Sequence, residues 1–137
     1  EGTGKDYLEE EIERLDLKNF VAIQPPRPHA ELLSLVALSR AVVVPSLSEV
    51  NPQIAVEALS RGIPVVISKY TGLSTPLREM TREIDPLFCA DIADALRDML
   101  SDEKWRGLRQ KILYAGMGRP FETVAGEYIA LVNNLSV

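Results

Sequence analysis

Residues 41–68 read AVVVPSLSEVNPQIAVEALSRGIPVVIS and contain two short apolar runs on either side of a helical pattern. The runs at residues 42–44 and 65–67 are continuously apolar, which is typical of strands in a parallel sheet covered by helices on both faces. Between them, Asn51 is a favourable N-cap, Pro52 suits the first helical position, and a glycine after the helix suits its end. Strand, helix and strand in this order predict a βαβ unit, which is right-handed by default.

The rest of the chain shows more helical than strand patterns. Helices are predicted at residues 6–16, 29–40, 74–83, 91–100, 102–114 and 121–135, a strand at 20–23, and at most a strand stub at 87–88. These patterns contain no internal repeat and no linker. The sequence therefore predicts one α/β domain over residues 1–137, with a Rossmann-like parallel sheet, flanking helices and a helical C-terminal tail.

The chain is acidic, with a net charge of −5 over 137 residues. This charge argues against nucleic acid or an anionic membrane as the main partner, because both are themselves negatively charged. A single cysteine, Cys89, excludes an internal disulfide and a thiolate metal cluster. No apolar run approaches the length of a membrane span and no signal peptide is visible, so we expect a cytoplasmic location.

Two glutamates mark the candidate site. Glu49 lies in the loop after the first valine strand, and Glu57 lies eight positions later in the predicted helix. Ligands of open α/β sheets bind beyond the carboxyl ends of the strands, where the free N–H groups of Gln53 and Ile54 are suited to phosphate. The two carboxylates can accept hydrogen bonds from hydroxyls. The alternative is a solvated loop charge and an ordinary helix-surface charge, but apolar neighbours make an unpartnered charge at Glu57 costly.

At these residues the chain resembles the C-terminal, donor-binding domain of GT-B glycosyltransferases, most closely the retaining family four. The motif residues that carry the resemblance are Pro45-Ser46, Glu49, Glu57-Ala58-Leu59, Gly62, Pro64-Val65-Val66 and Ser68. Upstream, Gly2 and Gly4 resemble the glycine pair that ends an earlier strand of this family. Downstream, residues 121–131 are similar to its closing helix. The resemblance covers nearly the whole chain.

The resemblance implies a role for each residue of the motif. Glu49 would be the catalytic residue that faces the transferred sugar, and Glu57 would bind the ribose hydroxyls of a nucleotide-sugar. The implied donor-binding residues are Glu57, Asn51, Pro52, Gln53, Ile54 and Gly4. The donor would be a UDP-, GDP- or ADP-hexose, and transfer would proceed with retention, without a cofactor or a bound metal. The sequence contains no Asp-x-Asp pair.

The resemblance also implies partners outside these residues. A glycan or lipid-linked acceptor would bind through a missing N-terminal domain, and the parent protein could associate peripherally with a membrane. The family's first donor-domain strands are absent, so we expect no transferase activity from these 137 residues alone. Val50-Asn51-Pro52 stands where many relatives have a phenylalanine-glycine pair, which would reshape the sugar pocket.

Other interpretations stay open at the level of sequence. They are a sugar-nucleotide epimerase half-domain, a non-catalytic receiver-type signalling module, and a degenerate GT-B-like nucleotide-binding module. Residues 69–73 form a loop on the ligand side, whose family counterpart often touches the donor. Lys69 and Arg78 follow the second valine strand, and we expect them to be solvated surface charges. His29, the single histidine, is expected to have a surface or capping role.

Overall fold

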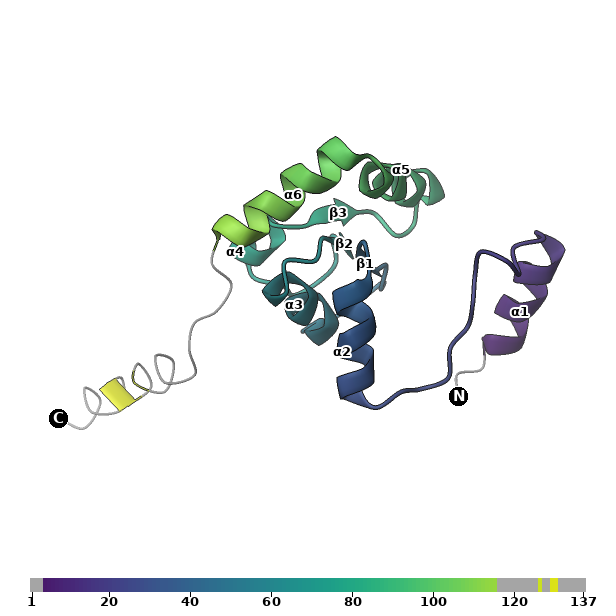
Figure 1. The fold of residues 1–137 in the computed structure, drawn as a ribbon, viewed down its shortest axis with the longest axis horizontal. Helices are drawn as coiled ribbons and strands as arrows, with labels where there is room; N and C mark the ends of the chain where they lie inside the picture. The colour runs from purple at the N-terminus through teal and green to yellow at the C-terminus, as the bar shows by residue number, and fades with distance from the viewer. Residues whose placement is uncertain (1–3, 116–125, 127–128, 131–137) are drawn as a thin grey trace. The chain divides into compact units, whose positions relative to one another are not determined.

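The computed structural model describes residues 4–115, 126 and 129–130. The chain divides into two units, residues 1–32 and residues 33–137 (Figure 1). The elements are α1 (Lys5–Arg14), α2 (His29–Leu38), β1 (Val42–Val44), α3 (Gln53–Ser60), β2 (Val65–Ser68), α4 (Thr75–Arg78), β3 (Arg82–Ile84), α5 (Cys89–Leu100) and α6 (Asp102–Tyr114). Helix α1 lies in the first unit, and the three strands lie in the second.

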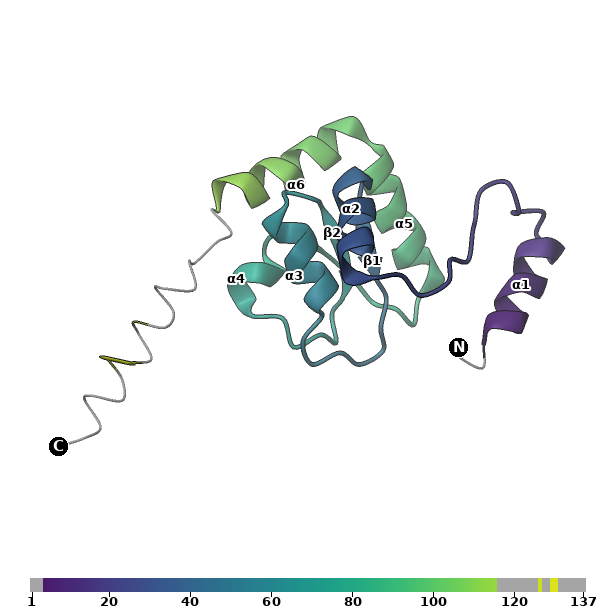
Figure 2. The ribbon, with the colours of Figure 1, turned by 60° about the horizontal axis from the view of Figure 1, so that its bottom comes forward.

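The strands form a parallel sheet in the order β1-β2-β3. The central strand β2 is buried along its whole length, with Val65 and Ile67 in one core cluster and Val66 in the other. This alternation follows from the period of two along a strand. Helices α2 and α3 lie on one face of the sheet and α5 on the other (Figures 1 and 2). Helix α6 follows α5 and buries Ile112 in the core cluster that contains Val65 and Ile67. The predicted βαβ unit and the flanking helices are confirmed.

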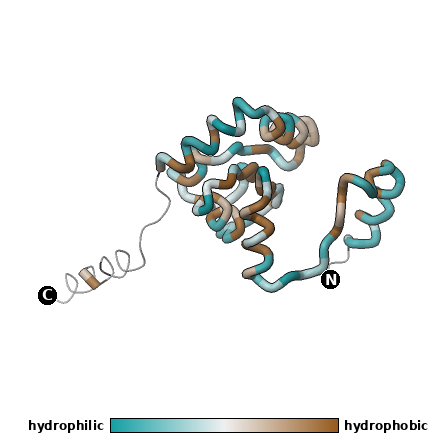
Figure 3. The backbone as a smooth tube through the Cα atoms, in the orientation of Figure 1, coloured by the Kyte–Doolittle hydropathy of each residue, from teal (hydrophilic) through white to brown (hydrophobic). Residues whose placement is uncertain are grey.

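Hydropathy along the chain agrees with this layering. Apolar residues run through β2 and along much of α2, whereas α1 is largely hydrophilic (Figure 3). Helix α2 buries Val36 in the core cluster that contains Val65 and Ile67, called the first core cluster below. Strand β1 is less covered than predicted, since Val43 is 37% exposed. Only one edge of β1 is paired among the described residues, which leaves part of its surface open.

Helix α3 has the predicted end but a shifted start. Pro52 occupies the N-cap position, and the helix begins at Gln53, so the prediction of Asn51 as N-cap is wrong by one residue. Gly62 follows the helix with φ of +70°, a conformation that glycine adopts without a steric penalty. The predicted C-terminal stop is therefore confirmed, and it directs the chain into β2.

Three other predicted elements need correction. Residues 20–23 form no strand: Phe20 is 83% exposed, and no strand of the described residues pairs with this segment. The helix predicted over residues 74–83 ends at Arg78, because Arg82–Ile84 pairs with β2 as the strand β3. Residues 87–88 are not a strand stub, since they lie between β3 and α5.

The remaining helices largely match their predictions. Helix α5 begins at Cys89, so Asp91 lies inside its first turn and does not cap it. The carboxylate of Asp91 instead accepts a hydrogen bond from the Asp85 N–H at 2.7 Å. Helices α1, α2 and α6 lie where the sequence predicted them. Most of the tail predicted at residues 121–135 lies outside the described residues.

Arg40, just before β1, contacts the C-terminal end of α5 and the first turn of α6. Its Nε donates to the Met99 carbonyl at 2.6 Å, and its guanidinium lies 5.0 Å from the centre of the Trp105 ring. Its Nη2 donates to the carboxylate of Asp102 at 2.6 Å. In return, the Trp105 indole N–H donates to the Arg40 carbonyl at 2.8 Å. Arg40 thus caps the C-terminal end of α5 with a positive charge, where the helix dipole favours one.

Replacing this arginine is expected to destabilise the fold. Arg40→Ala should lower the free energy of unfolding by about 1–3 kcal/mol, because hydrogen bonds from a charged group and a helix cap are lost together. Arg97→Ala is the matched control, since Arg97 is exposed and pairs with Asp94 on its own helix. Urea unfolding of both variants measures the difference. Equal stability of the two variants would contradict a capping role for Arg40.

Candidate functional site

The loops that follow β1 and β2 meet beyond the carboxyl ends of these strands. Glu49 and Thr71 form an isolated parallel bridge there. The Gly72 N–H donates to the Glu49 carbonyl at 2.8 Å. The pairing between β1 and β2 therefore resumes in the loops, and backbone atoms hold Glu49 in place. This edge is the one where ligands of open α/β sheets bind.

The side chain of Glu49 is available at this edge. It is partly exposed, and within residues 4–115 its carboxylate takes part in no hydrogen bond or ion pair. Leu47 and Val50 beside it are 65% and 84% exposed. Because the contacts of Glu49 with the protein come from its backbone, its carboxylate can serve a ligand without loss of a structural bond.

Helix α3 begins four residues after Glu49. Pro52 is buried, and its carbonyl accepts a hydrogen bond from the Ala55 N–H at 2.9 Å, which closes the turn. Among the described residues, no acceptor is found for the N–H groups of Gln53 and Ile54. These groups lie at the positive end of the helix dipole. Their role in phosphate binding stays a prediction. Asn51 is exposed and does not cap the helix.

Glu57 lies one turn further along α3 and is partly exposed. Its neighbours Ala58 and Leu59 are buried, but the helical period points them to the core. The apolar sequence around Glu57 therefore does not enclose its charge. The backbone carbonyl of Glu57 accepts hydrogen bonds from Ser60 Oγ at 2.8 Å and from Arg61 Nη1 at 2.9 Å. These bonds close the last turn of the helix and involve only the backbone of Glu57. The binding of hydroxyls by its carboxylate stays a prediction.

The loop after β2 is held by its own side chains. Ser68 Oγ accepts a hydrogen bond from the Tyr70 N–H at 3.1 Å, and Thr71 Oγ1 accepts one from the Leu73 N–H at 3.3 Å. Thr71 and Leu73 are both buried. Side-chain acceptors of this kind satisfy loop amides that have no sheet partner. The loop over residues 68–73 is therefore well anchored.

The two cations after β2 are at least partly exposed, as expected for surface charges, and both are paired with carboxylates. Lys69 Nζ lies 2.5 Å from Asp85 Oδ2, and Arg78 Nε donates to Glu83 Oε1 at 2.7 Å. The hydrogen bond to Asp85, with a smaller one to Tyr70, raises the pKa of Lys69. The hydrogen bond from Lys69 lowers the pKa of Asp85. The first pair joins the carboxyl end of β2 to the residue after β3, and the second joins α4 to β3.

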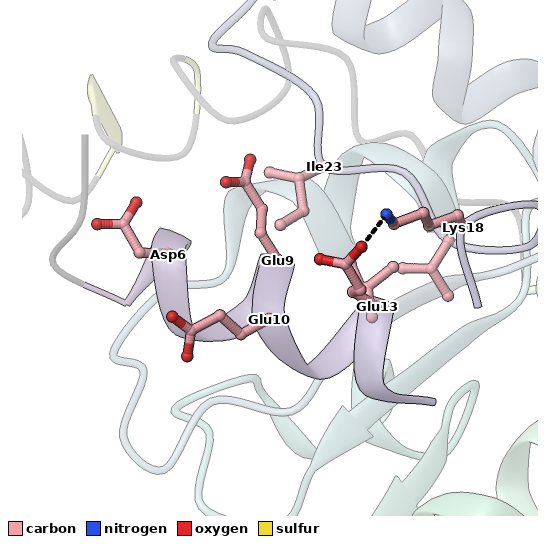
Figure 4. A pocket seen from close by; sticks show the side chains of 8 residues that line it. Asp6, Glu9, Glu10, Glu13, Lys18 and Ile23 are labelled. Carbon is pink, nitrogen blue, oxygen red and sulfur yellow. Dashed lines mark hydrogen bonds and ion pairs between the residues drawn. The ribbon is translucent and has the colours of Figure 1, made fainter. Parts of the chain in front are cut away.

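Gly4, predicted to bind the donor, lies in the first unit as the N-cap of α1 and is exposed. This unit also holds an open hollow of about 550 Å³ (Figure 4). Glu13 and Lys18 bond to each other there, and acidic side chains dominate the lining. Its residues are Asp6, Glu9, Glu10, Ile12, Glu13, Lys18, Val21 and Ile23. So many carboxylates disfavour a phosphate ligand, and the role of Gly4 stays a prediction.

Two further features bear on function. Among the described residues, no group of three or more His, Cys, Asp or Glu side chains could hold a metal ion. None of the described helices has the length and apolar character needed to span a membrane. The absence of a bound metal from the reaction remains a prediction.

The match to a known protein family is extensive. The family model described as glycosyl transferases group 1 matches residues 1–117. The chain belongs to this family. The D-inositol 3-phosphate glycosyltransferase of Thermobifida fusca is 33% identical over 104 residues, which cover 72% of this chain and 23% of that protein. The protein of the same name from Segniliparus rotundus is 31% identical over 122 residues, covering 85% of this chain and 24% of its own length.

This chain therefore spans about a quarter of the length of the curated relatives it matches. Among solved structures, sucrose-phosphate synthase from Thermosynechococcus elongatus superposes with a TM-score of 0.74 and 23% identity. The match covers 98% of this chain and 35% of that one. The predicted GT-B glycosyltransferase family and α/β fold are confirmed. Family membership supports a glycosyltransferase function over a receiver-type signalling module.

Sequence reasoning missed the part that Thr71 and Gly72 play at this site. Their backbone pairs with Glu49, which is far away in the sequence, so local sequence patterns cannot predict that pairing. The one available signal was the glycine itself, because a glycine in a loop between a strand and a helix often marks a close backbone approach.

Proposed function

We propose that this chain forms the donor half of a retaining, metal-independent hexosyltransferase. It binds a UDP-, GDP- or ADP-hexose at the carboxyl edge of β1 and β2. The observation that carries the proposal is the position of Glu49, whose backbone carbonyl accepts the Gly72 N–H close to the start of α3. Within the part of the chain that the structure describes, neither the Glu49 carboxylate nor the N–H groups of Gln53 and Ile54 have a hydrogen-bond partner. Membership of a glycosyltransferase family supports it.

The geometry of α3 suggests how the donor is arranged. The diphosphate receives hydrogen bonds from the N–H groups of Gln53 and Ile54, where the helix dipole stabilises its charge. Glu57 lies four residues after Gln53, about 6 Å along the helix axis. At that distance from the phosphates its carboxylate accepts hydrogen bonds from the ribose hydroxyls.

Glu49 acts on the sugar in this proposal. Its carboxylate orients the sugar hydroxyls and stabilises the positive charge that develops as the glycosidic bond to phosphate breaks. A fixed charge directed at a developing charge lowers the barrier because it needs no reorganisation during the reaction. Since the backbone of Glu49 is paired with the loop after β2, the main chain that carries the carboxylate is held in place before the substrate binds.

The acceptor is proposed to bind through protein outside these residues, and a glycan or lipid-linked alcohol is the first class to test. The matched relatives are named as D-inositol 3-phosphate glycosyltransferases, so a phosphorylated cyclitol is a second acceptor class. We propose that the reaction takes place in the cytoplasm, and a lipid-linked acceptor would bring the protein to a membrane surface. A donor-binding module without catalysis is the competing proposal.

Calorimetric titration of the full-length protein with UDP-, GDP- and ADP-glucose tests the donor site. We expect one of the three to bind at least tenfold more tightly than the other two, with unchanged affinity after EDTA treatment. Absence of binding by all three would overturn the proposal. Binding without transfer to any acceptor of the two classes would support the non-catalytic module.

A further inference from the structure

Gly72 lies where no larger residue fits. A Cβ atom added to Gly72 would lie 2.2 Å from the Val50 carbonyl oxygen and 3.1 Å from the carbonyl carbon. Contacts below 3.0 Å essentially do not occur for real Cβ atoms, and here the obstacle is backbone. Among the described residues, Gly62 is the glycine with a positive φ, so Gly72 is required for space and not for its backbone conformation.

The loop that carries Gly72 is anchored on both sides of the contact. Leu73 is buried in the first core cluster, and Thr71 is 7% exposed. Thr71 Oγ1 accepts the Leu73 N–H, and the Gly72 N–H donates to the Glu49 carbonyl. An atom added at Gly72 therefore cannot be accommodated by movement of this loop alone.

The opposing loop has fewer anchors. Val50 is 84% exposed, Leu47 is 65% exposed, and Asn51 is exposed as well. Its fixed points are the backbone pairing with residues 71–72 and the buried Pro52. Pressure on the Val50 carbonyl would move Val50 and the neighbouring Glu49, while Pro52 keeps the start of α3 in place.

We propose that Gly72 is a positioning residue, which fixes the Glu49 carboxylate by allowing the loops after β1 and β2 to touch through their backbones. The inference rests on the proposed function of Glu49. Gly72 should therefore affect the chemical step and not nucleotide binding. The residues proposed to bind the nucleotide, Gln53, Ile54 and Glu57, lie on α3, whose start is kept in place by Pro52. A displacement of about 1 Å in a reacting group can cost about a hundredfold in rate.

Steady-state kinetics of Gly72→Ala in the full-length protein test this assignment. We expect kcat to fall at least tenfold, with the Kd of the free nucleoside diphosphate within twofold of the wild-type value. Gly107→Ala is the control, because a Cβ at Gly107 meets nothing within 4 Å. We expect it to keep the wild-type kcat. A Gly72→Ala variant with unchanged kcat, or with an equal loss in nucleotide affinity, would overturn the inference.

Hydrogen exchange of the wild-type protein adds a test that does not require the variant to fold. The Gly72 amide should exchange at least tenfold more slowly than in an unstructured peptide, because it donates to Glu49. Exchange at the unstructured rate would overturn the inference. A wild-type protein that binds no nucleotide-sugar would defeat the proposed function. A wild-type protein that transfers sugar, with Gly72→Ala equally active, would defeat only the role of Gly72.

Discussion

Glu49→Ala is expected to lower kcat about 10²–10³-fold, the usual loss when one group that stabilises a developing charge is removed. The side chain is replaced while the backbone pairing with Thr71 and Gly72 remains, because those contacts involve main-chain atoms. Affinity for the free nucleoside diphosphate should stay within twofold, since the phosphate-binding amides belong to α3. Initial rates with saturating donor and acceptor, together with a nucleotide titration, measure both quantities.

Two controls separate charge from shape. Glu49→Gln keeps the size of the side chain and removes its charge, so it should lose most of the activity that Glu49→Ala loses. Glu103→Ala removes an exposed carboxylate from α6 and should leave kcat unchanged. A Glu49→Ala variant with full turnover would show that Glu49 has no part in the chemistry, and that its backbone contacts alone account for its position.

Glu57→Ala is expected to raise the Kd of the preferred nucleotide-sugar about 10–100-fold. Hydrogen bonds to a charged group contribute about 1.5–3 kcal/mol, and the ribose hydroxyls would lose their bonds to the Glu57 carboxylate. Alanine is a good helix former, so α3 should remain intact. Calorimetric titration of the wild-type and variant full-length proteins measures the change, with Glu103→Ala as the matched carboxylate control.

A deoxyribose analogue of the donor locates this effect on the ribose. Wild-type protein should lose affinity for the analogue, whereas Glu57→Ala should bind the analogue and the ribose donor equally, because the partner of the hydroxyl is already gone. Such non-additivity identifies two groups that interact directly. If Glu57→Ala still prefers the ribose donor by the full wild-type factor, another residue binds the hydroxyls.

Whether a segment forms a strand depends on whether a neighbouring strand is there to pair with it, and the local sequence does not always contain that information. Residues 65–67 and their neighbours are apolar and central, so local composition was sufficient. Strand β3 begins with Arg82 and Glu83 and has no local strand signal. It forms because β2 offers a free edge, and because Asp98 and Arg78 pair with its charges. Residues 20–23 are the reverse case, an apolar run without a pairing strand among the described residues.

By itself the sequence determined the βαβ unit and the placement of Glu49 on a loop and Glu57 on a helix. Periodicity, the glycine at the end of the helix and chain order specify these features locally. Only the tertiary structure decided that Gly72 meets the loop of Glu49, and that Lys69 pairs with Asp85. These contacts join segments that become neighbours once the sheet has formed, so no local pattern contains them.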